Sequence, residues 1–253
     1  MAYFDIHEKL YEASGEGDAT RVRDLLAAGA DPHKYKDNDG DAALIWAAYL
    51  GRDSVVSLLI QHGADLNIQD NFGRTALYRG AGNGHNQVTA ALIKAGADLK
   101  IQDKDGWTAL HRAAGNGENE VTTTLIKAGV ELNVQNKDGW TALHWAAANG
   151  KNEVTIILIK AGAEINKQNN DWDTALHRAA GNGYNEVTSR LVEAGADLDI
   201  QNNDGETALH RAAAYGKKVT TTLIKAGADL NIPNNEGKTP IQVARNEEIA
   251  RLD

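Results

Sequence analysis

Residues 103–135 read DKDGWTALHRAAGNGENEVTTTLIKAGVELNVQ and supply the pattern that the rest of the chain repeats. Glycines recur at a spacing of 33 residues or a multiple of 33, at Gly40, Gly73, Gly106, Gly139 and Gly205. The missing member of this series is Trp172. The segment VTTTLIKAG occurs at 121–129 and at 219–227, 98 residues apart, so one residue is lost after Gly216. Such a period indicates an array of similar structural units.

Each repeat predicts two short helices. Thr108 is a suitable N-cap, and the helix after it carries apolar residues on one face, at Leu110, Ala113 and Ala114. A second helix has its apolar face at Val121, Leu125 and Ile126 and ends at Gly129. Helices of about eight to ten residues are too short to be stable alone. Each repeat must therefore pack against its neighbours, and we expect an all-α stack.

The segment RGAGNG at 79–84 has the glycine spacing of a phosphate-binding loop. Such a loop occurs once and begins a helix, whereas here the motif recurs at 111–117 and 177–183, after alanine-rich runs. Glycines in that position end a helix, so the pattern disfavours a nucleotide site.

Composition excludes several classes of function. The formal net charge of -9 disfavours nucleic-acid binding. The chain contains 0 cysteines, which excludes disulfides, thiolate nucleophiles and cysteine zinc sites. The N-terminus lacks the pattern of a signal peptide, and no segment predicts a membrane span. We therefore expect a cytoplasmic protein, in a host cytosol if it is a secreted effector, that works without membrane contact or a cofactor.

The motif D-x-D-G-W-T-A-L-H-x-A-A-x-x-G followed by V-T-x-x-L-I-K-A-G-A-D-L-N resembles the ankyrin repeat across nearly the whole chain. The resemblance implies one all-α domain, an α-solenoid of 33-residue helix-turn-helix units with β-turn fingers. It also implies protein binding through a concave side, built from the first helices, and through the fingers. We assign an N-terminal cap to 1–36 and a C-terminal cap to 234–253, and the internal repeats to 37–69, 70–102, 103–135, 136–168, 169–201 and 202–233.

Four histidines recur beside the N-cap, at His111, His144, His177 and His210. Metal ligands must converge on one ion at about 2 Å, but equivalent side chains of neighbouring repeats lie roughly one helix diameter, about 10 Å, apart. We therefore expect structural hydrogen bonds from these histidines and no metal site. The sequence contains no acid, base and nucleophile in a catalytic pattern, so we expect no enzyme.

Residues that differ between repeats mark candidate partner contacts. Two positions beyond the core leucine of the first helix, the side chain points away from the core. These residues form a set that we call the ladder: Trp46, Arg79, Arg112, Trp145, Arg178 and Arg211. Tyr49 and Tyr215 share its face, and small residues beside it, such as Gly115, leave room for a partner. Arg, Trp and Tyr are common in binding hot spots, and the arginines form a positive stripe.

The alternative is a self-contained surface, in which the tryptophans stack on arginines of adjacent repeats. The fingers supply further exposed candidates: Phe72, Trp107, Trp140 and Trp172, with Arg74 and Asp173 among them. Packing between fingers is their structural alternative. Trp172 replaces a glycine and predicts strain or a remodelled turn, because glycine suits positive φ.

Two functions follow from the sequence. The first is a non-catalytic module, expected to be monomeric, that binds a protein partner carrying an acidic segment and an apolar anchor. The second is a structural scaffold or a fragment of a larger multidomain protein whose activity lies elsewhere.

Overall fold

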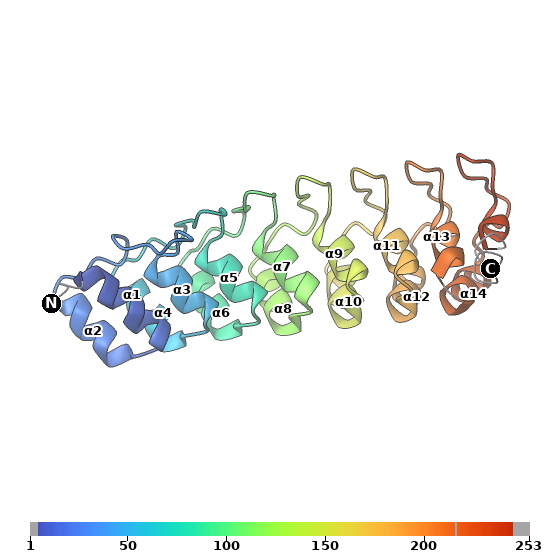
Figure 1. Ribbon diagram of the computed structural model, residues 1–253. Coiled ribbons are helices and arrows are strands. Elements are labelled where there is room, and N and C mark those ends of the chain that lie inside the picture. The colour runs from blue at the N-terminus through green and yellow to red at the C-terminus, as the bar shows by residue number, and fades with distance from the viewer. Residues whose placement is uncertain (1–4, 216, 245–253) are drawn as a thin grey trace. The chain divides into compact units, whose positions relative to one another are not determined.

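The computed structural model describes residues 5–215 and 217–244, without the side chains of residues 214, 215 and 217. These residues contain short helices joined by turns and no strand. The labelled helices (Figure 1) are α1 (Ile6–Glu16), α2 (Ala19–Ala27), α3 (Ala43–Tyr49), α4 (Asp53–Gln61), α5 (Ala76–Gly82), α6 (Asn86–Lys94), α7 (Ala109–Asn116), α8 (Asn119–Lys127), α9 (Ala142–Ala148), α10 (Asn152–Lys160), α11 (Ala175–Gly181), α12 (Asn185–Glu193), α13 (Ala208–Tyr215) and α14 (Lys217–Ala226). A further short helical stretch covers 240–244. The all-α prediction is confirmed.

The chain forms two compact units, each described by itself. Unit 1 comprises Met1–Ala113 and Glu118–Glu131, and unit 2 comprises Ala114–Gly117 and Leu132–Asp253. Within each unit, first helices pack on the first helices of adjacent repeats, as in the pairs α3 with α5 and α11 with α13. Second helices pack on second helices in the same way, as in α4 with α6 and α10 with α12. The expected stack of helix pairs is present in both units.

The core of each repeat lies where the sequence predicts it. In α9, Leu143 and Ala146 are buried, and in α10 the buried positions are Val154 and Leu158. Helices of 7 and 9 residues cannot hold these faces together alone. Burial of the faces between adjacent repeats supplies the missing stability.

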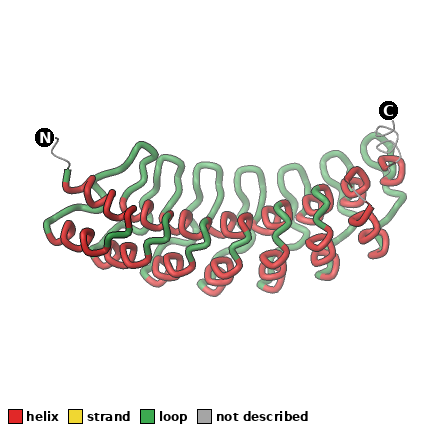
Figure 2. Tube along the Cα trace, turned by 60° about the horizontal axis from the view of Figure 1, so that its bottom comes forward, coloured by secondary structure: helices red, strands yellow, loops and turns green. Residues whose placement is uncertain are grey.

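Turns that we call the fingers connect each repeat to the next, and in Figure 2 they are the green loops that extend beyond the helices. Each finger starts with an Asp or Asn whose side-chain oxygen accepts the backbone N–H groups two and four residues later; in one finger these belong to Phe72 and Arg74, at 2.8 and 2.9 Å from Asp70. Adjacent fingers also share backbone hydrogen bonds, such as Asn71 N–H to Asp39 O at 2.8 Å. The fingers are therefore ordered by local side chains and by their neighbours.

Trp172 has the backbone conformation of the glycines that it replaces. Its φ is 62°, and the equivalent Gly139 and Gly205 have φ of 77° and 72°. Trp172 is the one residue other than glycine with positive φ in the described part of the chain. A side chain in this region costs about 1–2 kcal/mol. The predicted strain at Trp172 is confirmed.

The lost residue after Gly216 shortens one connection. Two residues, Gly117 and Glu118, separate α7 from α8, but only residue 216 separates α13 from α14. Gly216 itself lies outside the described residues. The shorter connection predicts that the second helix of this repeat starts late or that the repeat is rotated against its neighbour. Helix α14 does not start late, because Lys217 is the counterpart of Asn119.

Candidate partner-binding surface

A hydrogen-bonded turn positions the ladder at the start of each first helix. In the α9 turn, Thr141 Oγ1 accepts the N–H of His144 at 3.4 Å, and His144 Nδ1 accepts the N–H of Thr141 at 3.2 Å. The N–H of Trp145 donates to Thr141 O at 3.1 Å and begins the helix. The same exchange joins Thr174 to His177, and the N–H of Thr207 donates to His210 Nδ1 at 3.0 Å. The histidines are therefore structural, as predicted.

The second ring nitrogen of each histidine reaches the following repeat. His144 Nε2 lies 3.0 Å from Asp173 O, and His177 Nε2 lies 3.0 Å from Glu206 O. Since Nδ1 already accepts a hydrogen bond, the single proton of the neutral ring must be on Nε2. Burial disfavours the charged imidazolium, so it lowers the pKa of His144 to about 4 and also lowers the pKa of His177. Each neutral imidazole connects two adjacent repeats within unit 2.

Acid is expected to weaken unit 2 through His144. Its pKa is about 4 in the folded state and near the ordinary value of 6.5 in the unfolded chain. The unfolded state therefore binds more protons, so stability is full above pH 6.5 and falls as the pH approaches 4. By pH 5.5 the loss should be about 1 kcal/mol.

The measurement is the free energy of unfolding of the parent and of His144→Gln between pH 7 and pH 5. Other groups also titrate in this range, and burial raises the pKa of Asp41 to about 6, so the difference between the two proteins isolates His144. Parallel pH profiles would contradict the assignment.

In unit 1 the ladder begins with an aromatic stack. Trp46 lies nearly parallel to Tyr49, with ring centroids 5.5 Å apart, and nearly parallel to Tyr11, with centroids 6.0 Å apart. A Cβ at Gly15 of α1 would overlap the Trp46 indole. Trp46 therefore fills space above a glycine of the preceding repeat, while Tyr49 stays 37% exposed.

Arg79 is held by two buried carboxylates of unit 1. Its Nη2 lies 3.2 Å from Asp41 Oδ2 and 3.2 Å from Asp70 Oδ2. The guanidinium also lies over the Tyr49 ring, 5.1 Å from the centroid. Arg74 donates from Nε to the same Asp70 oxygen at 2.7 Å. The charge of Arg79 is therefore neutralised within the fold.

Arg112 differs from the other arginines of the ladder. Its guanidinium lies over the Tyr78 ring, 5.8 Å from the centroid, and no carboxylate of the described residues pairs with it. Arg178 and Arg211 each form an ion pair with a carboxylate five residues earlier in the sequence. Arg79 and Arg211 each form an ion pair with a carboxylate 38 residues earlier. At these two offsets Arg112 has Trp107 and Arg74. Arg112 thus forms no ion pair with the described residues.

In unit 2 the ladder continues with Trp145, which packs edge-on against Trp140 with centroids 5.5 Å apart. A Cβ at Gly115 would overlap the Trp145 indole, so the space that we expected a partner to enter is already filled. This expectation was wrong because a repeat without a large side chain at one position accommodates the larger side chain of its neighbour.

Asp173 joins the two remaining arginines. Its side chain is fully buried, and its Oδ2 lies 3.0 Å from Arg178 Nε and 3.1 Å from Arg211 Nη2. Asn202 donates to Oδ1 at 2.8 Å. Arg178 also pairs with Asp171 at 2.8 Å and lies 4.5 Å from the centre of the Trp140 ring. The expectation that Asp173 is an exposed finger residue was wrong, because it closes a buried charge network.

The positive stripe expected from four arginines is therefore mostly neutralised. Arg79, Arg178 and Arg211 have carboxylate partners, which agrees with the self-contained alternative, although the rings beneath Arg79 and Arg178 belong to Tyr49 and Trp140 rather than to ladder tryptophans. The carboxylates Asp41 and Asp70 did not figure in our sequence prediction. Asp41 lies 38 residues before Arg79, as Asp173 does before Arg211, and this shared offset is a signal that could have identified Asp41.

The finger aromatics fall into two groups. Trp107 packs edge-on against His111 with centroids 5.4 Å apart, Trp140 packs against Trp145, and Arg74 covers Phe72 at 4.1 Å. Trp172 has no ring or cation contact among the described residues and is 58% exposed. The side chain of Tyr215 lies outside the described part of the chain.

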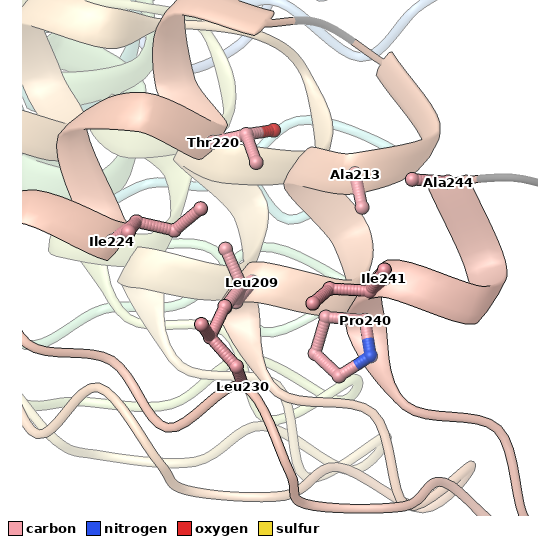
Figure 3. A pocket seen from close by; sticks show the side chains of 8 residues that line it. All are labelled: Leu209, Ala213, Thr220, Ile224, Leu230, Pro240, Ile241 and Ala244. Atoms are coloured by element: carbon pink, nitrogen blue, oxygen red, sulfur yellow. The ribbon is translucent and has the colours of Figure 1, made fainter.

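An apolar groove of about 260 Å³ lies near the end of unit 2 (Figure 3). Side chains of α13, α14 and the 240–244 helix line it, among them Leu209, Ile224 and Ile241. Ile224 is 43% exposed, whereas its counterparts Ile126 and Ile159 are half-buried by further packing. The C-terminal cap that we predicted at 234–253 lies partly in residues 245–253, outside the described chain.

The described residues contain neither a metal site nor a membrane-spanning helix. Residues 5–215 and 217–244 contain no cluster of His, Asp and Glu side chains arranged to hold a metal ion. None of the helices in these ranges is long and apolar enough to span a bilayer.

The repeat geometry agrees with a comparison against protein families. A family model described as ankyrin repeats (3 copies) matches residues 10–103, 80–169, 151–234 and 176–252. The chain belongs to the ankyrin-repeat family. Ankyrin repeats are generally protein–protein interaction modules. A search among curated proteins found no match for this chain.

The family assignment accounts for the shared positions of this ankyrin-repeat protein. The Thr and His residues of the turn, the buried leucines and the finger glycines recur because they form the turn, the core and the finger of most repeats. The ladder and finger aromatics vary among repeats, so they carry what is individual to this chain.

Proposed function

We propose that this chain is a non-catalytic module that binds a protein partner through the ladder and the finger aromatics. The observation that carries the proposal is Arg112, the ladder arginine without a carboxylate in the described residues. Its half-buried guanidinium lies beside Tyr78 and is a strong, charged hydrogen-bond donor that forms no ion pair with the described residues. Arg and Tyr are frequent hot-spot residues at protein interfaces.

The partner contributes a carboxylate to Arg112 and an apolar anchor beside it. Arg74 places a second positive charge near Tyr78, whose phenol donates to Asp103 Oδ2 at 2.6 Å. The exposed edge of Tyr49 offers apolar contact area in the same unit. An acidic segment with one large apolar side chain complements these features. We propose a cytoplasmic monomer, since a net charge of -9 opposes self-association and the chain lacks cysteine for disulfides.

Replacing Arg112 with alanine is expected to weaken partner binding without unfolding the protein. A central hot-spot arginine contributes about 2 kcal/mol, which corresponds to roughly 30-fold in affinity. The guanidinium has no ion pair in the described fold to lose, so the melting temperature should stay close to that of the parent. The partner is first recovered with the parent chain as bait, and its affinity is then measured by calorimetry.

Lys127→Ala is the matched control, because Lys127 is an exposed cation at the end of the second helix in the same repeat. It should change the affinity by less than about 0.5 kcal/mol. Unchanged binding by Arg112→Ala, together with loss of binding by Trp107→Ala or Trp140→Ala, would move the site from the ladder to the fingers. Unchanged binding by all of these variants would refute the proposed surface.

A further inference from the structure

Trp172 combines two features that the fold of unit 2 does not require. Its φ of 62° is the conformation that the other fingers give to glycine. Its side chain is 58% exposed, compared with 48% for Phe72, the next most exposed aromatic residue described. A glycine would satisfy the backbone here and would leave no apolar surface in water. The turn would therefore form with glycine at position 172 and does not require the tryptophan side chain.

The charged groups near Trp172 indicate which kind of ligand its indole can bind. Backbone hydrogen bonds of 3.0 Å, from Asn170 N–H to Asp138 O and from Asn203 N–H to Asp171 O, hold three adjacent fingers side by side. Asp138, Asp171 and Asp204 occupy the same exposed position in these fingers. Arg178 pairs with Asp171, while Asp138 and Asp204 have no cation within ion-pair distance in the described residues. The Trp172 finger thus lies between two fingers that each carry an exposed carboxylate at the same position.

Unit 2 already contains a cation that contacts an indole ring and carboxylates at the same time. Arg178 lies over Trp140 at 4.5 Å while it pairs with Asp171 and Asp173, so one guanidinium uses an indole and carboxylates together. Trp172 and its neighbours present the same two components on the exposed side of the fingers. An indole is the most favourable aromatic face for a cation.

We propose that Trp172 is a docking position for a positively charged side chain, an arginine or lysine of the protein partner. The cation lies over the indole, and Asp138 and Asp204 supply the opposite charge. The net charge of -9 steers a cationic segment toward the chain. This inference rests on the proposed protein-binding function for the identity of the ligand, but it concerns the fingers, and a short peptide tests it without the partner.

The test uses the whole chain and the peptide acetyl-Gly-Arg-Gly-Arg-Gly-amide, with a second peptide in which neutral citrulline replaces arginine. The indole N–H signal of Trp172 is followed by NMR and assigned from its disappearance in Trp172→Gly. We expect the arginine peptide to shift this signal in a saturable way, and the citrulline peptide to bind about fivefold more weakly. Trp172→Tyr should retain part of the affinity, because it keeps an aromatic face.

Trp172→Gly should bind the arginine peptide at least about fivefold more weakly and should melt no lower than the parent, since glycine suits this φ. Equal affinity for the two peptides, or no loss in Trp172→Gly, would overturn the proposal. The two proposals fail separately: a partner affinity that depends on Arg112 but not on Trp172 leaves the ladder intact and refutes the finger site. The reverse result refutes the ladder and supports the finger site.

Discussion

Replacing Leu143 with aspartate is expected to destabilise the protein by about 4 kcal/mol or more, because a carboxylate has no partner in that core. Leu143 is 1% exposed on α9, where α10 and α11 pack against it. Each repeat contacts only its neighbours, so the damage should centre on these helices. Hydrogen exchange followed by mass spectrometry should show lost protection from α9 to α11, while α1 to α4 of unit 1 stay protected.

Lys160→Asp is the control for this experiment. Lys160 is exposed at the end of α10, so the same new charge should leave hydrogen exchange in α9 and α11 nearly unchanged. Uniform loss of protection from α1 to α14 in Leu143→Asp would show that the array unfolds as a single cooperative unit. That outcome would contradict the nearest-neighbour account of stability.

Asp173→Ala is expected to have the second largest effect, about 3 kcal/mol, since it removes the buried carboxylate that Arg178 and Arg211 share and leaves them only the more exposed Asp171 and Glu206 as partners. The carboxylate forms ion pairs with Arg178 and Arg211 and accepts a hydrogen bond from Asn202, with no exposure to solvent. The two arginines are 23% and 33% exposed, so water relieves part of the cost and places it at the low end for such pairs. Urea unfolding at pH 7 measures the change.

Asp171→Ala separates burial from charge in this network. Asp171 also pairs with Arg178, at 2.8 Å, but its side chain is 67% exposed. Its removal should cost less than about 0.5 kcal/mol. Equal effects of the two substitutions would mean that the Asp173 network stabilises the fold no more than a surface ion pair does.

Local patterns in the sequence were enough to predict the repeated elements. The 33-residue glycine spacing, the Thr N-cap and the apolar positions of each short helix predict the helix pairs that the structure contains. The role of the histidines was predictable for the same reason, because Thr141 and His144 are three residues apart and meet in one turn. The backbone at Trp172 was predictable from the glycines at the equivalent positions.

The burial and the ion pairing of each candidate site residue depended on side chains from other repeats. Arg79 and Arg112 look equivalent in the sequence, but Asp41, 38 residues before Arg79, neutralises one, while Arg74 stands at that offset from the other. Gly115 predicted open space, which Trp145 of the following repeat fills. The residues at which helices and turns begin and end depend on neighbours within about four residues along the chain, so sequence patterns reveal them. Burial and ion pairing depend on distances across the stack, which the three-dimensional packing of the repeats determines.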